Sequence, residues 1–149
     1  MSIRTAFDAD VLIYSAAPGH PHGAALADLL TERGEDGWAG IGSVLLLTEV
    51  LAKPMRENAD SAEVAALVSV LSRVQLLPLD EATARLAVEL AVAYGLRAAD
   101  AAHLATAVAA GADRFLTNNR KDFREDIAEI DIVYPDTLVA AAAPAPEGT

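Results

Sequence analysis

Apolar and polar residues follow one another along this chain in a pattern that switches repeatedly between strand-like and helix-like spacing. Five short apolar runs have the composition of β-strands: Arg4–Phe7, Trp38–Ile41, Gln75–Leu79, Arg114–Thr117 and Ile130–Tyr134. Between these runs, apolar residues recur every three or four positions, which indicates helices. The predicted helices cover Val11–Ala16, Gly23–Arg33, Val44 to about Lys53, Ser61–Arg73, Glu81–Tyr94 and Ala98–Ala110.

Local signals place the ends of several of these helices. Ser43 and Asp80 stand in front of apolar helical segments and are residue types that favour the N-cap position. Gly95 and Gly111 follow two helices at the position where glycine commonly ends them. Pro54 is expected to close the helix that follows Ser43, because the residue before a proline avoids helical geometry.

Strands that alternate with helices predict an α/β fold, a three-layer α/β/α sandwich with a mostly parallel central sheet. We expect one domain over residues 1–135 and an Ala/Pro-rich tail over residues 136–149, with disorder near Pro144–Thr149. Ligands of such sheets bind beyond the carboxyl ends of the strands. Asp8 and Thr117 each follow or end a predicted strand, so both are expected on that side.

Composition narrows the classes of function. The 149 residues are 53% hydrophobic, which suits one packed core. The absence of cysteine excludes disulfides, thiolate zinc sites and cysteine nucleophiles. Asp8 and Asp10 interrupt the N-terminal apolar stretch, so it does not read as a signal peptide. The longest strongly apolar run, Trp38–Thr48, is shorter than the roughly 20 residues that span a bilayer. We therefore expect a soluble cytoplasmic protein with no membrane partner.

The net charge of −11 bears on possible partners. Nucleic-acid-binding surfaces are usually basic, so the charge alone argues against an RNA-binding protein. Part of the negative charge is accounted for if several carboxylates hold a metal ion. A strongly acidic surface also favours a basic protein partner.

Three carboxylates lie in strongly apolar segments, where an isolated charge costs on the order of several kcal/mol. They are Asp8, Glu49 and Asp100. Each could have its own cation, since Lys53 lies four residues after Glu49 and Arg97 three before Asp100. Alternatively, one divalent cation satisfies all three, and oxygen ligands are those that Mg²⁺ or Mn²⁺ prefers. The residues alone leave both possibilities open.

Four segments resemble, in the same order, the four motifs of one nuclease family. Phe7–Ile13 is an apolar strand end followed by Asp-x-Asp, and Ser43–Leu51 is an apolar helix that carries one Glu. Ala98–Ala105 opens a helix with an Asp, and Phe115–Phe123 is a strand followed by Thr, polar residues and Asp-Phe. Together they resemble PIN domains, and the match spans most of the chain.

The resemblance implies hydrolysis of RNA phosphodiester bonds with Mg²⁺ or Mn²⁺ as cofactor. It implies that Asp8, Glu49 and Asp100 are catalytic metal ligands. Asp122 is the candidate for a fourth acidic position, because Asn119 stands where other members place an acid. The alternative for Asp122 is a structural role at a helix start.

The size and layout are most similar to the toxin half of VapBC toxin–antitoxin pairs. This likeness implies a homodimer and a cognate antitoxin whose basic segment occupies the acidic groove. A role in general RNA processing would leave the same residues in place.

Several nearby residues have less certain roles. Thr117 either hydrogen-bonds an acid or phosphate, or caps the strand end. His103, one helical turn after Asp100, is interpreted as a core or interface histidine, with contact to the acids as the alternative. The locally basic stretch of residues 113–124 could contact RNA phosphates. Its cationic residues are Arg114, Arg120, Lys121 and Arg124.

Two other classes of protein fit part of the pattern. The Asp8-x-Asp10 pair also resembles the opening of haloacid-dehalogenase phosphatases, where Asp8 would be the nucleophile and Asp10 the general acid. That family needs a positioned lysine, and Lys53 and Lys121 are the only lysines. A non-catalytic PIN-like interaction module is the other alternative. Such a module would tolerate loss of its acidic residues, whereas the acidic positions of this chain are filled, which argues against it.

Overall fold

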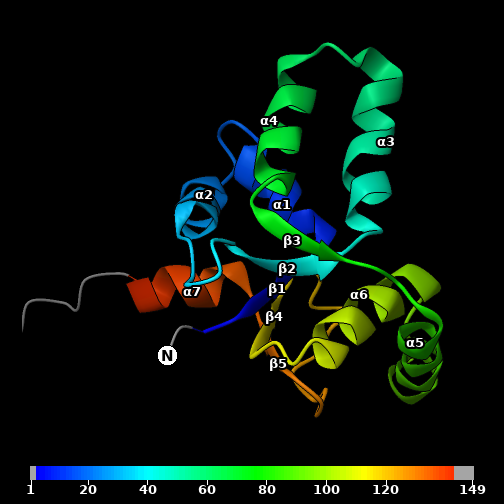
Figure 1. Ribbon diagram of the computed structural model, residues 1–149. Coiled ribbons are helices and arrows are strands. Elements are labelled where there is room, and N and C mark those ends of the chain that lie inside the picture. The colour runs from blue at the N-terminus through cyan, green and yellow to red at the C-terminus, as the bar shows by residue number, and fades with distance from the viewer. Residues whose placement is uncertain (1–2, 143–149) are drawn as a thin grey trace, which may run out of the picture.

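The computed structural model describes residues 3–142, and in them five strands form a single parallel sheet (Figure 1). The strand order is β3-β2-β1-β4-β5. The strands are β1 (Thr5–Phe7), β2 (Gly40–Ser43), β3 (Val74–Leu77), β4 (Arg114–Leu116) and β5 (Asp131–Val133). The helices are α1 (Ala9–Ala16), α2 (Gly23–Thr31), α3 (Leu46–Asn58), α4 (Ala62–Leu71), α5 (Glu81–Tyr94), α6 (Ala98–Ala109) and α7 (Pro135–Ala142).

Helices cover both faces of the sheet, so the predicted three-layer sandwich is confirmed. Successive residues of a strand point to opposite faces. Ala6 of β1 packs with residues of α5 and α6, such as Leu90 and Leu104, whereas Phe7 packs with residues of α1, α2 and α4, such as Leu12 and Leu67. The sheet is entirely parallel. All its strands therefore end at the same edge.

Helix α5 begins and ends at the residues that the sequence predicts. Asp80 accepts a hydrogen bond from the backbone N–H of Thr83 at 2.8 Å, as an N-cap residue does. Gly95 ends the helix in the left-handed conformation, with φ of 67°. Both predictions are confirmed.

The prediction for helix α3 was wrong at both ends. Ser43 is the last residue of β2, and its hydroxyl accepts from the N–H of Leu45 instead of capping the helix. Pro54 lies inside the helix, which continues to Asn58. Proline removes only one N–H donor, and α4 packs along α3 (Figure 1). This packing supports the last helical turns, which sequence signals alone did not indicate.

Strand β2 begins two residues later than predicted, at Gly40, where its backbone lies close to that of β1. A Cβ atom at Gly40 would lie 2.3 Å from the carbonyl oxygen of Thr5 and 2.4 Å from the ring of Phe7. Glycine therefore lets β2 lie against β1 at this point. Trp38, which we predicted to open the strand, precedes it and is 37% exposed.

The C-terminal part of the chain continues the fold beyond residue 135. Residues 135–142 form α7, and Leu138 packs against the core on the α2 side of the sheet. The predicted disorder near Pro144–Thr149 falls outside the described residues, and the boundary at residue 135 stays a prediction. Among residues 3–142, no helix has the length and apolar character needed to cross a membrane.

Candidate active site

Asp8 occupies the turn between β1 and α1, at the carboxyl edge of the sheet. Its Oδ1 accepts from the N–H of Ala9 at 2.8 Å, which caps α1 two residues earlier than we predicted. Its Oδ2 accepts from the Thr117 hydroxyl at 2.7 Å. Strand β4, which Thr117 follows, pairs directly with β1, so the parallel register brings the two side chains together. Asp8 is only 6% exposed, and burial raises the pKa of its carboxyl.

Asp10 lies two residues after Asp8, in the first turn of α1, and faces the same edge. Both of its carboxylate oxygens accept from the backbone N–H of Asn118, the shorter distance being 3.1 Å. Burial, followed by the negative charge of Asp8, raises the pKa of Asp10 to about 7. Sequence reasoning did not include Asp10 among the nuclease site residues, although the Asp-x-Asp spacing was visible.

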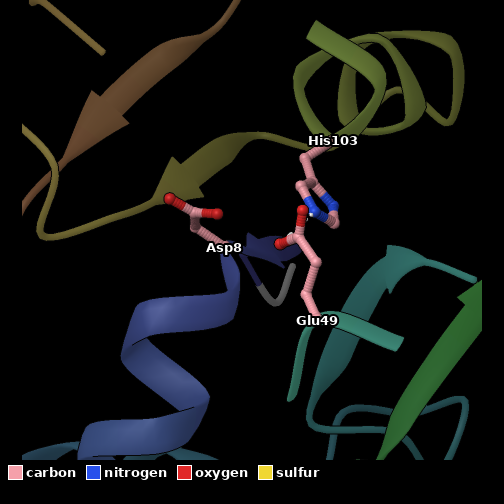
Figure 2. A group of neighbouring side chains, drawn as sticks. All are labelled: Asp8, Glu49 and His103. Carbon is pink, nitrogen blue, oxygen red and sulfur yellow. Dashed lines mark hydrogen bonds and ion pairs between the residues drawn. The ribbon is translucent and has the colours of Figure 1, made fainter. Parts of the chain in front are cut away.

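Glu49 comes from α3 and meets His103 of α6 beside Asp8 (Figure 2). Glu49 Oε2 lies 2.9 Å from Nε2 of His103. One ligand atom from each of Asp8, Glu49 and His103 lies within 4.8 Å of the other two. The structure therefore brings together two acids that are 41 residues apart and adds a histidine that sequence reasoning assigned to the core or an interface.

Asp100 and Asp122 lie outside this 4.8 Å group. Burial raises the pKa of Asp100, and the charges of Asp8, Asp122 and Glu49 raise it further. Asp122 accepts from the side-chain amide of Asn119 at 2.9 Å. Asn119, which stands at the other candidate position, thus holds Asp122 in place by a hydrogen bond.

The alternative in which each acid has its own lysine or arginine is not found in residues 3–142. The ion pairs there are Arg85–Glu81, His103–Glu49, Arg120–Asp136 and Arg124–Asp126. Neither Lys53 with Glu49 nor Arg97 with Asp100 is among them. Both Lys53 and Lys121 are exposed, and in the described structure neither hydrogen-bonds Asp8, as a dehalogenase-like phosphatase would require.

The basic stretch lies only partly beside the site, so that prediction was wrong for Arg114. Arg114 opens β4 at the amino edge of the sheet, where its Nε donates to the Thr5 hydroxyl at 2.8 Å. Arg120 pairs with Asp136 and lies 4.2 Å from the ring centroid of Tyr134. In the described structure, no lysine or arginine of this stretch forms an ion pair with Asp8, Glu49 or Asp100.

The arrangement fits a divalent cation. Buried carboxylates with raised pKa values are costly to ionise without a counter-charge. The carboxylates of Asp8 and Glu49 converge from β1–α1 and α3, and Asp100 is close enough for the charges of Asp8 and Glu49 to raise its pKa. Carboxylate oxygens are the preferred ligands of hard divalent ions such as Mg²⁺ or Mn²⁺.

Comparison with known proteins points to one family. The family model of the PIN domain matches residues 6–143. No curated protein sequence matches the chain.

Three solved structures have the same fold at low sequence identity. A toxin–antitoxin complex from Klebsiella pneumoniae matches with a TM-score of 0.67 and 22% identity, over 89% of this chain and 97% of that one. DNA-bound VapBC from Salmonella typhimurium matches with a TM-score of 0.69 and 19% identity, over 90% of this chain and 99% of that one. VapBC2 from Rickettsia felis, bound to a DNA fragment from its promoter, matches with a TM-score of 0.67 and 16% identity, over 89% of this chain and 98% of that one.

Proposed function

This chain belongs to the PIN-domain family, and from that premise we propose that it is a divalent-metal-dependent ribonuclease. One observation carries the proposal: Asp8 and Glu49 converge at the carboxyl edge of the sheet, without lysine or arginine partners in the described structure. The same edge is where ligands of parallel α/β sheets bind.

Asp8, Glu49 and Asp100 would hold the ion, directly or through water, and Asp122 would be an outer member of the set. The donor chemistry favours Mg²⁺ or Mn²⁺ over softer metals. When bound, the ion supplies a Lewis acid that offsets negative charge on the phosphodiester and activates water near neutral pH.

The chain's own residues preorganise this edge. The Thr117 hydroxyl fixes one oxygen of Asp8, and the N–H of Ala9 fixes the other. The N–H of Asn118 holds Asp10 beside them. These hydrogen bonds keep like charges close together, which makes the edge a stronger cation site than separate carboxylates would be.

We further propose that the protein is the toxin of a toxin–antitoxin pair. The three structures of similar fold described above are toxin–antitoxin complexes, two of them VapBC. The net charge of −11 suits an antitoxin whose basic segment covers the acidic edge. A homodimer in the cytoplasm belongs to the same proposal.

The test of the enzyme is cleavage of total cellular RNA by purified protein with and without Mn²⁺. We expect metal-dependent cleavage by the wild type and none by Asp8→Asn. Arg114→Met is the matched control, because Arg114 lies at the opposite edge of the sheet and should leave cleavage unchanged. Cleavage by Asp8→Asn at the wild-type rate would contradict the proposal.

The toxin role needs a separate experiment. Expression with the neighbouring gene products should yield co-purification with a small basic protein that suppresses cleavage. Mapping the RNA ends then identifies the sequence that is cut. If the protein cleaves RNA but no small basic protein co-purifies with it or suppresses cleavage, the ribonuclease proposal stands and the toxin role is contradicted.

A further inference from the structure

His103 stands out because its two ring nitrogens have opposite surroundings. Its side chain is fully buried in the described structure. Nε2 lies 2.9 Å from Oε2 of Glu49, whereas Nδ1 is enclosed and has no hydrogen-bond partner among the described residues. This difference decides which nitrogen carries a proton.

A neutral imidazole has one N–H, and a buried N–H without an acceptor is costly. If the proton were on Nδ1, it would have no acceptor, and Nε2 would face a carboxylate oxygen with its lone pair. If the proton is on Nε2, it is donated to Glu49, and Nδ1 is left as an unpaired acceptor. The second arrangement is favoured because it forms a hydrogen bond to a charged group.

The same reasoning separates a metal ligand from a supporting residue. To bind a metal through Nε2, His103 would have to carry its proton on Nδ1. Histidines that bind metals almost always donate the other ring N–H to a carboxylate, carbonyl or water. Nδ1 has no such acceptor in the described structure. Mg²⁺ and Mn²⁺ also prefer oxygen to nitrogen ligands.

We propose that His103 is a positioning residue, which donates its Nε2–H to Glu49 and does not itself bind the metal. This inference rests on the proposed function, because orienting Glu49 has a consequence only if Glu49 holds a cation. Glu49 is the most flexible member of the trio, since it has a long side chain that is 33% exposed. The rigid, buried imidazole holds one carboxylate oxygen and leaves the other for the ion.

The first test uses the metal-free wild-type protein and needs no RNA. Long-range ¹H–¹⁵N NMR correlations report which ring nitrogen carries the proton, and His103→Gln identifies the signals among the three histidines. We expect a proton on Nε2 of His103 and, in the neutral ring, an unprotonated Nδ1. A neutral ring protonated on Nδ1 would overturn the proposal.

The second test measures Mn²⁺ affinity by calorimetry in two variants. His103→Leu removes the donor and should weaken binding about 10-fold, the lower range for loss of a supporting hydrogen bond. His103→Gln keeps an N–H donor and should stay closer to the wild type. In a Glu49→Gln background, His103→Leu should have little further effect. Equal losses in both backgrounds would overturn the link to Glu49.

The third test asks about direct ligation. Pulsed electron paramagnetic resonance of bound Mn²⁺ detects a coordinated imidazole nitrogen by its coupling to the ion. We expect the wild type and His103→Leu to give the same spectrum, without a nitrogen coupling from His103. A coupling that is present in the wild type and lost in His103→Leu would show that His103 is a ligand and would overturn the proposal. None of these three measurements uses RNA, so their results do not depend on whether the protein cleaves it. A protein that fails to cleave RNA would contradict the proposed ribonuclease but would leave the role of His103 to these measurements.

Discussion

The two edges of the parallel sheet handle charge in opposite ways. At the amino edge, Arg4 donates to the carbonyl oxygen of Ala110 and Arg114 to the hydroxyl of Thr5. A cavity of about 480 Å³ opens there, lined by equal numbers of arginine and acidic side chains. These are Arg4, Arg33 and Arg114 with Glu32, Glu35 and Asp36. Charge at this edge is balanced within the chain.

The carboxyl edge has no such balance. Asp8, Asp10 and Asp100 all have raised pKa values, with burial as the largest cause in each case. Hydrogen bonds from Ala9, Thr117 and Asn118 orient Asp8 and Asp10 but carry no full charge, and the one basic side chain paired with these acids in the described structure is His103, which contacts Glu49. The comparison supports a cation from outside the chain at the carboxyl edge, where the acids have no lysine or arginine partner in the described structure, whereas arginines and acids occur together at the amino edge.

The largest expected effect is loss of RNA cleavage in Asp8→Asn. The substitution removes a charge from the centre of the acidic cluster, and preorganised electrostatic groups of this kind contribute on the order of 10²–10³-fold or more. The rate of cleavage of an RNA substrate in Mn²⁺ is the measurement. Arg114→Met, at the balanced edge, should cleave at close to the wild-type rate. Equal losses in both variants would mean that the two edges do not differ in function.

The second effect is stabilisation by metal. A ligand that binds only the folded state contributes about 2.7 kcal/mol at a concentration 100 times its dissociation constant. Mn²⁺ should therefore raise the Tm of the wild type and of Arg114→Met, but not that of Asp8→Asn. Thermal unfolding with and without Mn²⁺ measures this. A rise in Tm that survives in Asp8→Asn would place the ion elsewhere.

The third effect is a pH dependence of the metal-free protein. The pKa of Asp10 is about 7 in the folded state, above its unfolded value, so the folded state binds more protons between these values. Stability should then fall as pH rises from 5.5 to 7.5, by on the order of 2 kcal/mol from Asp10. Denaturant unfolding at the two pH values is the measurement, and Asp10→Asn should flatten the slope. An unchanged slope in that variant would remove Asp10 as its source.

A smaller effect is expected for Asp122→Asn. Asp122 raises the pKa of Asp100 through its charge but lies outside the 4.8 Å group. We expect cleavage to fall about tenfold, as for groups that support a metal site from outside. A loss as large as that of Asp8→Asn would instead make Asp122 a direct ligand.

The smallest effect belongs to Arg114→Met, measured as stability. It leaves the hydroxyl of Thr5, which is 3% exposed, without its partner at a cost of about 1 kcal/mol. Denaturant unfolding should show this loss equally at pH 5.5 and 7.5, with and without Mn²⁺. A loss that changed with metal would link the amino edge to the site.

Features that depend on neighbouring residues were predictable from the sequence. Asp80 and Gly95 mark the ends of α5 through their own backbone contacts, and Asp8 was placed correctly because it directly follows β1. Asp8, Glu49 and Asp100 were singled out because they lie in apolar segments, although Glu49 is exposed in the structure, and their role as metal ligands stays a prediction.

Features that depend on distant residues were not predictable in the same way. The continuation of α3 past Pro54 depends on packing with α4. Arg114 is an exception, since its place at the start of a predicted strand already indicated the amino edge. The contact between His103 and Glu49 joins residues 54 positions apart. Only the helical spacing of His103 from Asp100 indicated that it could face the acids.

The most direct test of the account is a crystal structure of the protein grown with Mn²⁺, with the ion located by anomalous scattering. We predict an ion at the carboxyl edge, bound by oxygens of Asp8 and Glu49 with Asp100 close by. An ion at another position, or acids that point apart with each paired to its own arginine or lysine, would contradict it.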